Sequence, residues 1–381
     1  MKAYSPVRFP VRLADIFRAV VARKPPSPGR EFFSSGRMAL AVALRCLADD
    51  HRPARREVII PDFICTSVSQ AVVAAGFTPV FCALKPETWF YDLAELRKSI
   101  HDRTAAVVVV YFFGQKPDLN NHQWNLVEEL LEDVAVIEDL AQAYGFDHRE
   151  SDPFVSAFRI ASFGPGKSLP MGCGGVIEVV DPDLADRLSS ISRAVKQQGT
   201  FSGLINLTRC WVQSQILHPS LWPFFWRLAD KFYHTAEVGE WQEGARLSSR
   251  AATYVFCAEH TLQREIDTRR RNAVWLRQHL DQLDALTMPS EENLERGVCL
   301  RFPIVLSNQA ETKEVLRRLH AEKILVGGGD WADFGGARPS AIDLGHRVVA
   351  LPTHSESESI RAKIVEVFYE TLGTRKHEKV A

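Results

Sequence analysis

Local patterns that would indicate a metal site or a disulfide framework are missing from this sequence. The seven cysteines, at positions 46, 65, 82, 173, 210, 257 and 299, include no C-x-x-C pair, and the twelve histidines form no H-E-x-x-H motif. Zinc sites and disulfide scaffolds need cysteines and histidines at such spacings. We therefore predict neither, and a chain of 381 residues is long enough to be stabilised by its hydrophobic core.

The sequence also lacks an excess of charge of one sign and a long hydrophobic run. Its 46 Lys and Arg residues are balanced by 47 Asp and Glu residues, whereas nucleic-acid binding requires clustered basic residues. The longest uninterrupted apolar run, residues 105–113, is about half as long as a membrane-spanning helix. Residues 1–23 lack the apolar core of a signal peptide. Together these absences predict a cytoplasmic protein that does not bind nucleic acid.

Between residues 37 and 180, short apolar runs alternate with segments of helical periodicity. Continuous apolar strands separated by amphipathic helices are typical of a doubly wound, mostly parallel α/β sheet that is covered on both faces. Ligands of such sheets bind at the carboxyl ends of the strands. The expected strands are 58–60, 79–82, 105–113, 134–137, 159–163 and 175–180, and the expected helices are 38–47, 68–75, 92–100 and 122–131.

The sequence also indicates how the whole chain is divided into domains. We expect an N-terminal extension over residues 1–30, a large domain over 31–250, and a connector helix with a small C-terminal α+β domain over 251–381. That small domain is expected to contain strands 298–306 and 324–326 and helices 309–322 and 355–371. The large domain contains an aromatic-rich insertion, 195–241, that covers the core or packs on a second subunit; alternatively, residues 205–233 contact a membrane surface or a partner.

A lysine in a glycine- and proline-rich turn is the sharpest local feature of the sequence. Residues 162–168 read SFGPGKS, but a nucleotide-binding P-loop needs a glycine where this chain has Ala161, and Pro170 interrupts the helix that should follow. If Lys167 is buried between two strands, desolvation lowers its pKa and makes it a nucleophile for an aldehyde. The alternative is an exposed turn lysine.

Two weaker features accompany Lys167. The apolar run 134–137 is followed by two acids, of which Asp139 is the second. Asp139 either points into the ligand crevice, where it pairs with a buried cation, or caps a helix. Ser35, Gly36 and Arg37 open a helix whose free N–H groups and positive dipole end suit a phosphate. A lysine, an acid and an anion site are together what pyridoxal 5'-phosphate requires: for its aldehyde, its pyridine nitrogen and its phosphate.

Several segments resemble the DegT/DnrJ/StrS-type pyridoxal-phosphate-dependent sugar aminotransferases, a family of fold-type I in the aspartate aminotransferase superfamily. The resemblance rests on five motifs in the same order and at the same spacing. They are EVIIP at 57–61, AAGFTPVF at 74–81, VYFFGQKPD at 110–118, IEDLAQA at 137–143, and the Ser-Phe of 162–163 followed by Lys167.

The resemblance implies a role for each matched residue. Lys167 would hold the cofactor and move a proton at the substrate carbon, and Asp139 would pair with the pyridine nitrogen. Gln142 would lie near the phenolic oxygen, while Ser162 and the turn Ser35, Gly36 and Arg37 would bind the phosphate. Because the dehydratases of the family have histidine in place of Lys167, the lysine favours transamination.

The family also implies the substrates and the assembly. We expect an amino acid, glutamate in the first instance, to donate its amino group to a keto group of a nucleotide-linked sugar or a similar polyol. Polysaccharide or secondary-metabolite biosynthesis is the expected context, and a homodimer is the expected assembly. The alternatives are other chemistry of the same cofactor, or a non-catalytic relative that binds or regulates.

Three departures from the family pattern indicate a divergent branch. Arg37 replaces the threonine that usually follows the glycine of the phosphate turn. Cys65 stands where an aromatic ring usually stacks on the cofactor, and a thiol stacks less well than a ring. No asparagine occurs near residues 244–247, where the family has one that reaches the phosphate of the neighbouring subunit.

Overall fold

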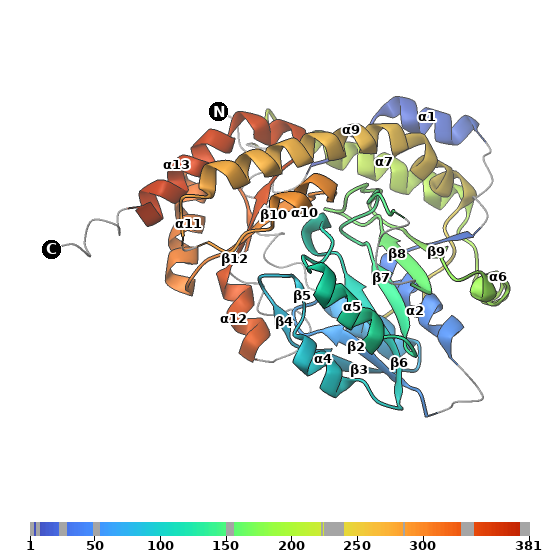
Figure 1. Ribbon diagram of the computed structural model, residues 1–381. Helices are drawn as coiled ribbons and strands as arrows, with labels where there is room; N and C mark the ends of the chain where they lie inside the picture. Colours follow the sequence, from blue (N-terminus) through green and yellow to red (C-terminus); the bar gives the residue numbers. More distant parts are fainter. Residues whose placement is uncertain are drawn as a thin grey trace.

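Two β-sheets and one long helix organise the chain (Figure 1). The computed structural model describes residue 4 and residues 8–22, 29–48, 54–149, 156–221, 224, 240–284, 286–328 and 339–373. The long helix, α9 (Ser249–Leu280), runs from the large sheet to the small one. It begins where the Ser248 side chain accepts a hydrogen bond from the Ala251 N–H, an arrangement typical of a helix N-cap.

The large sheet is mostly parallel, which confirms the predicted fold class. Only β9 runs antiparallel to its neighbours β8 and β1. Parallel strands need crossover helices, and these account for the alternation read from the sequence. In sheet order, the strands are β1 (Arg30–Phe33), β9 (Gly175–Val179), β8 (Phe158–Ser162), β7 (Ala135–Asp139), β6 (Thr104–Val110), β2 (Glu57–Pro61) and β3 (Thr78–Cys82).

Helices cover both faces of this sheet. Along β6, Val107 and Val109 belong to one buried cluster, whereas Val108 and Val110 belong to another. A strand buried on both faces is apolar at every position, which explains the run of valines. The first cluster includes residues of α1 (Leu13–Val21), α4 (Leu93–Ser99), α5 (Asn121–Leu130), α7 (Thr200–Ile216) and α9; the second includes residues of α2 (Gly36–Leu47), α3 (Thr66–Ala74) and α6 (Ala185–Ala194).

The small sheet is antiparallel and packs against the end of α9. Its order is β10 (Arg301–Val305), β12 (Val348–Pro352) and β11 (Gly327–Gly328). Phe302 and Ile304 of β10 share a buried cluster with Leu276 of α9. The described residues also form the hairpin of β4 (Leu84–Lys85) and β5 (Phe90–Tyr91), the short 3₁₀ helices η1 (Phe112–Gly114), η2 (Pro182–Leu184) and η4 (Ser355–Ser359), and the helices α10 (Glu291–Arg296), α11 (Gln309–Ala321), α12 (Pro339–Arg347) and α13 (Arg361–Leu372).

The elements predicted from periodicity agree best with the structure in the large sheet and least well in the small sheet. The strand expected over 324–326 is wrong, because Tyr4 pairs with Ile324 and the strand β11 forms only at residues 327–328. The helix expected over 355–371 is divided into η4 and α13. The sequence reading also missed β1, α12 and the central strand β12.

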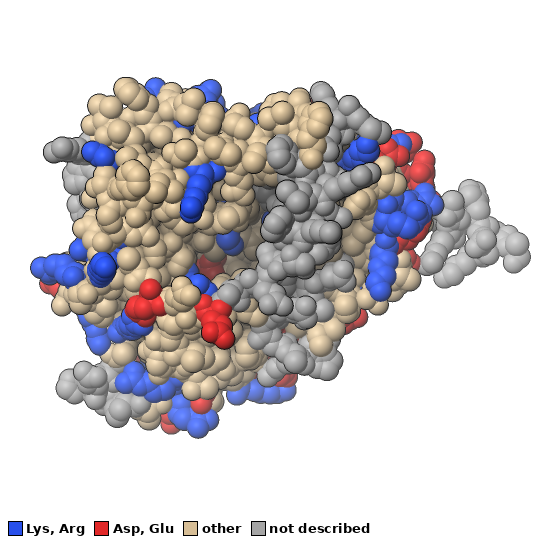
Figure 2. Space-filling view, turned by 180° about the vertical axis from the view of Figure 1, so that it is seen from behind, with Lys and Arg blue, Asp and Glu red and all other residues tan. Residues whose placement is uncertain are grey.

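The aromatic-rich segment is described only in part. Residues 200–216 form α7, whereas Trp222, Phe225, Trp226, Phe232 and Tyr233 lie outside the described residues. None of the helices formed by described residues combines the length and the hydropathy of a membrane span. On the described surface in Figure 2, basic and acidic side chains lie in small groups separated by uncharged residues. The proposed domain limits, and a membrane contact of residues 205–233, stay predictions.

Candidate active site

A cavity of about 370 Å³ opens at the carboxyl ends of β6, β7 and β8, between the large sheet and residues of the small sheet. This is where a parallel sheet is expected to bind its ligand, and the volume suits a small molecule. The residues that line it are Gly36, Arg37, Leu40, Phe63, Ile64, Cys65, Ser67, Val68, Val110, Phe112, Phe113, Asp139, Ala141, Gln142, Ile160, Ser162, Lys167, Arg301, Val326 and Gly327.

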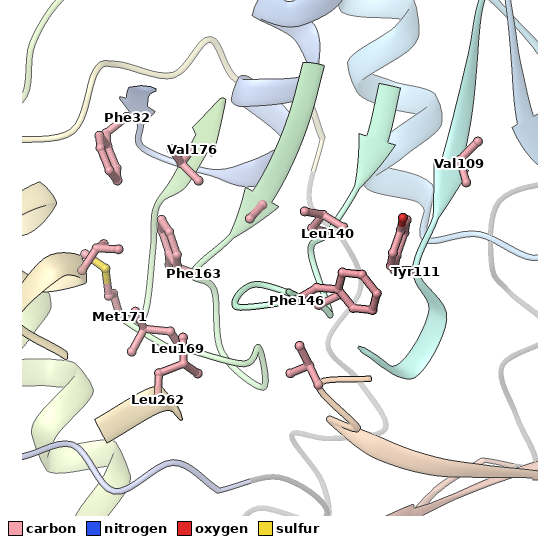
Figure 3. Packing of buried hydrophobic residues seen from close by; sticks show 14 of the residues in the cluster. Phe32, Val109, Tyr111, Leu140, Phe146, Phe163, Leu169, Met171, Val176 and Leu262 are labelled. Carbon is pink, nitrogen blue, oxygen red and sulfur yellow. The ribbon is translucent and has the colours of Figure 1, made fainter. Parts of the chain in front are cut away.

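Lys167 projects from a turn that is anchored on both sides. Before it, Phe163 is fully buried; after it, Leu169 and Met171 are fully buried, close to Leu262 of α9 (Figure 3). The Ser168 hydroxyl donates a hydrogen bond of 2.9 Å to the main-chain carbonyl of Gln142. The turn is therefore held by packing and by a hydrogen bond, which fixes the origin of the lysine side chain.

The environment of Lys167 disfavours its charged form. Burial lowers the pKa of the Lys167 amine; the negative charge of Asp139 opposes this, and the positive charge of Arg301 adds to it. The overall direction is a lowered pKa, which raises the share of neutral, nucleophilic amine. The alternative of an exposed turn lysine is not what the structure describes.

Asp139 is the last residue of β7, and its side chain lines the cavity. Its carboxylate accepts a hydrogen bond of 2.8 Å from the Ala141 N–H. Burial raises the pKa of the carboxyl, while this N–H and the charge of Lys167 lower it, and the overall direction is upward. A carboxylate in such a place is stabilised by a cation that enters the cavity.

The neighbouring acid, Glu138, has a different environment. Its carboxylate accepts hydrogen bonds from the hydroxyls of Tyr111 (2.6 Å) and Ser156 (2.7 Å) and from Arg159 Nε (2.8 Å). Successive residues of a strand point to opposite faces, so only one of the two acids lines the cavity. The sequence showed two acids at the strand end, and the tertiary structure separates them into a paired one and a cavity-lining one.

The start of helix α2 lies directly against the end of β8. A Cβ atom on Gly36 would come within 2.6 Å of Ser162 Cβ, so no larger residue fits there without displacement. Gly36 and Ser162 both line the cavity, whereas Ser35 is not a lining residue. Ser35 instead caps α2, because its side chain accepts a hydrogen bond from the Met38 N–H. The helix start thus lies beside a serine hydroxyl, and the N–H groups of a first helical turn together with a hydroxyl suit a phosphate.

Three other predicted residues also reach the cavity. Arg37 lines it, and its Nη1 donates to Gln70 Oε1 at 3.2 Å. Cys65 precedes α3 and accepts a hydrogen bond of 3.1 Å from the Ser67 hydroxyl. Gln142 Oε1 is buried and has no hydrogen-bond partner among the described residues. A buried acceptor of this kind fits a ligand that donates a hydrogen bond.

The sequence reading missed the residues that close the cavity from other elements. Phe112 and Phe113 belong to η1, where Phe113 has φ 56°, an uncommon conformation for a bulky residue. Arg301 is contributed by β10 and Gly327 by β11. Phe112 and Phe113 lay within a run that the pattern assigned to a strand, and nothing local marks Arg301 as a cavity residue.

The side chains that line the cavity match the chemical groups of pyridoxal 5'-phosphate. A half-buried lysine with a lowered pKa, a buried carboxylate and a helix start beside Ser162 line one cavity. The unpartnered Gln142 Oε1 adds an acceptor. The residues described here therefore fit the cofactor.

Comparisons with known proteins agree with this site. Residues 32–214 match the DegT/DnrJ/EryC1/StrS aminotransferase family. The chain is similar to a UDP-N-acetyl-3-dehydro-alpha-D-glucosamine 3-aminotransferase of Acidithiobacillus ferrooxidans, with 27% identity over 89% of this chain and 83% of that protein. It is also similar to a UDP-2-acetamido-2-deoxy-3-oxo-D-glucuronate aminotransferase of Pseudomonas aeruginosa, with 32% identity over 36% of this chain and 38% of that protein.

Solved structures share the fold. Helicobacter pylori PseC, an aminotransferase involved in the biosynthesis of pseudoaminic acid, superposes with a TM-score of 0.71 at 15% identity, over 98% of this chain and 100% of that one. Bacillus subtilis NtdA with bound cofactor PMP superposes with a TM-score of 0.65 at 16% identity, over 90% of this chain and 73% of that one. At these identities the likeness concerns the fold.

Proposed function

Because this chain belongs to the DegT/DnrJ/EryC1/StrS aminotransferase family, we propose that it transfers an amino group from an amino acid to a keto group of a nucleotide-linked sugar. Glutamate is the first candidate for the amino donor. The observation that carries the proposal is the cavity lined by Lys167 and Asp139 together with the start of α2. Relatives named for UDP-, GDP- and dTDP-linked sugars support this class of acceptor, in polysaccharide or secondary-metabolite biosynthesis.

Pyridoxal 5'-phosphate supplies, when bound, an electron sink for the charge that develops at the substrate carbon. Asp139 is proposed to hold a proton on the pyridine nitrogen, since a buried carboxylate is stabilised by a cationic partner. Lys167 is proposed to hold the cofactor through its Nζ and to move a proton to and from the substrate carbon. Its lowered pKa suits both tasks, because the neutral amine is the base and the nucleophile.

The remaining predicted residues are proposed to hold and orient the cofactor. Gly36 and Ser162 would bind the phosphate, with Arg37 adding positive charge and Ser35 ordering the helix start through its cap. Gln142 would lie against the phenolic oxygen. Cys65 would lie in place of the stacking ring, so we expect contact with the cofactor there to be weaker than in relatives with an aromatic residue.

A homodimer and a cytoplasmic location are also proposed, the first from the resemblance to enzymes that complete their sites across subunits. Here residues of the 244–247 segment lie along the edge of the large sheet of the same chain, where Arg246 bridges Phe33. Sedimentation of the holoenzyme tests the assembly directly. A monomer with full activity would contradict the dimer proposal.

Cofactor capture is the first experiment for the proposed function. The purified protein incubated with pyridoxal 5'-phosphate should absorb visible light, and borohydride should fix the cofactor on the peptide that contains Lys167. Addition of glutamate should then remove the visible band. Lys98→Ala, at an exposed lysine that pairs with Glu95, is the matched control and should retain both results.

The outcomes separate the alternatives. No visible band and no fixation would contradict every cofactor-dependent function and favour a binding or regulatory relative. A band that glutamate leaves unchanged would contradict this amino donor, and a panel of other amino acids would then identify the donor or exclude transamination.

A further inference from the structure

The exposed large apolar side chains of the described residues are concentrated in two segments of the chain. Eight of the nine belong to α1, to α7 or to the residues just after α7, and the ninth is Val73 of α3. Single exposed apolar residues are normal on a protein surface, whereas a group of them marks a contact surface. The eight are Leu13, Phe17, Val21, Phe201, Ile205, Val212, Leu221 and Phe224.

Helix α1 carries apolar side chains on its outer side. Leu13, Phe17 and Val21 repeat every four residues, so they form one exposed stripe along the helix. Asp15 and Ala19, on the side that faces the protein, are buried. A surface helix normally has a polar outer face. Packing of the chain on itself therefore explains the inner side of α1 and leaves the outer stripe without an explanation.

Helix α7 repeats this arrangement. Its inner residues Leu207 and Cys210 are buried, whereas Phe201 and Ile205, four residues apart, are exposed. The most exposed ring of each helix lies largely in solvent, because Phe17 is 69% and Phe201 is 76% exposed. Two separate segments thus expose apolar and aromatic residues in the same pattern.

The two helices pack against the same half of α9 (Figure 1). Ala19 of α1 and Leu207 of α7 share one buried cluster with Tyr254 of α9. Val11, just before α1, and Leu217, just after α7, line one small cavity, so the start of α1 lies near the end of α7. The two exposed stripes therefore belong to one region of the surface, which we call the α1–α7 face.

The exposed charges of the α1–α7 face are basic. Asp15, the one acid within residues 11–22 and 195–221, is buried, where the Thr261 hydroxyl donates a hydrogen bond of 3.0 Å to it. The whole chain has 46 basic and 47 acidic residues, so this imbalance is local. The exposed charged residues of the two ranges are Arg12, Arg18, Lys196 and Arg209.

We propose that the α1–α7 face docks on a membrane surface that contains anionic phospholipids. Helices that lie in such a surface bury phenylalanine and leucine at the edge of the acyl chains, while arginine and lysine contact the headgroups. A second copy of the same face is disfavoured, because two-fold pairing would place arginines opposite arginines, with no exposed acid of these ranges between them. The inference does not depend on the proposed function.

Vesicle flotation of the protein incubated with pyridoxal 5'-phosphate tests the proposal. The protein should float with vesicles of phosphatidylglycerol and phosphatidylcholine, and its affinity for vesicles of phosphatidylcholine alone should be lower by roughly tenfold or more. Raising the salt concentration from about 0.1 M to about 0.5 M should weaken binding to the anionic vesicles, because salt screens the basic side chains.

Variants show whether the α1–α7 face causes the binding. The pair Phe17→Ser and Phe201→Ser should weaken it on the order of 100-fold, because two rings no longer leave water. The pair Arg12→Gln and Arg209→Gln should weaken it roughly 10-fold on anionic vesicles. Val73→Ser removes the exposed apolar residue outside the face and should keep full binding. All these positions are exposed, so the unfolding midpoints should stay close to that of the native protein.

Four results would overturn the proposal. Three are a native protein that does not float, equal affinity for the two kinds of vesicle, and binding that the Phe17→Ser and Phe201→Ser pair retains. The fourth is a change of assembly state in this pair, measured by sedimentation, because the face would then be a contact between subunits. Failure of the proposed function would appear separately, as a protein that captures no cofactor.

Discussion

On the two faces of strand β7, neighbouring acids have different numbers of hydrogen-bond partners. On one face Glu138 is buried with Tyr111, Ser156 and Arg159, each of which donates a hydrogen bond to it. On the other face Asp139, equally buried, accepts one hydrogen bond, from the Ala141 N–H, among the described residues. We refer to Glu138 and its three partners as the Glu138 cluster.

The difference separates structural from functional polar groups. A buried carboxylate surrounded by donors is satisfied by the protein itself and links β7 to its neighbours. A buried carboxylate with fewer partners, close to a lysine whose pKa is also displaced, is typical of an active site. The comparison predicts that changes on the cavity face alter activity, while changes in the Glu138 cluster alter stability.

The largest expected effect is on the cavity face, at Lys167. Lys167→Ala should lower the rate of amino transfer by on the order of 10⁴-fold, because both the nucleophile and the proton carrier are lost. The unfolding midpoint of the cofactor-free protein should not fall, since no buried partner is left without its hydrogen bond. Single-turnover kinetics and chemical denaturation measure the two effects, and a strongly destabilised variant would contradict the division of roles.

The next largest effect is expected in the Glu138 cluster. Glu138→Gln should destabilise the protein by about 2–4 kcal/mol, because Arg159 loses its ion pair and an amide donor then faces other donors. Asp139→Asn is the comparison variant and should change stability by less than about 1 kcal/mol. Denaturant unfolding of the cofactor-free proteins measures both, and equal losses would remove the distinction between the two faces.

A smaller effect is expected at the start of α2. Gly36→Ala should weaken cofactor binding by roughly 10- to 100-fold, because the added methyl group meets Ser162 and shifts the N–H groups at the helix start. Gly199→Ala, whose added Cβ would have no neighbour within 4 Å, is the control. Fluorescence titration with the cofactor measures the affinity, and identical affinities would show that the phosphate binds elsewhere.

The smallest effect concerns pH. The folded protein has a lowered pKa for Lys167, and an unfolded lysine titrates near about 10.4. Burial of this amine therefore costs stability below the folded pKa, and the cost falls to zero as pH rises through the unfolded value. In the cofactor-free protein, Lys167→Met should be more stable than the native chain at pH 7, and the gap should close toward pH 10. A gap that widens with pH would contradict a lowered pKa.

The sequence allowed prediction of the fold class and of the residues expected to carry the chemistry. The runs that became β2, β6 and β7 lie within a few residues of the predicted strands, because strands buried on both faces are apolar throughout. Lys167 and Asp139 could be found because a lysine in a glycine turn and an acid after a buried strand are local signals. Their roles stay proposals, for which the experiments above provide the tests.

Other parts of the site left no local signal. Arg301 looks like any charged residue at a strand start, and it reaches the cavity only because Gly114 brings the two sheets together. The strand β12 was missed because it follows directly on α12, so that no turn separates the two elements in the sequence. Contacts between residues far apart in sequence depend on the packing of whole elements, which periodicity does not encode.

The sequence by itself determined that this chain forms a doubly wound α/β protein with a lysine and an acid at strand ends, because periodicity and turn residues act locally. Only the tertiary structure decided which of two adjacent acids faces the cavity, that Ser162 lines the cavity while Ser35 caps α2, and which arginine of the small sheet stands beside Lys167. Burial and charge arise from elements brought together in space, so the pKa values of Asp139 and Lys167 are properties of the fold.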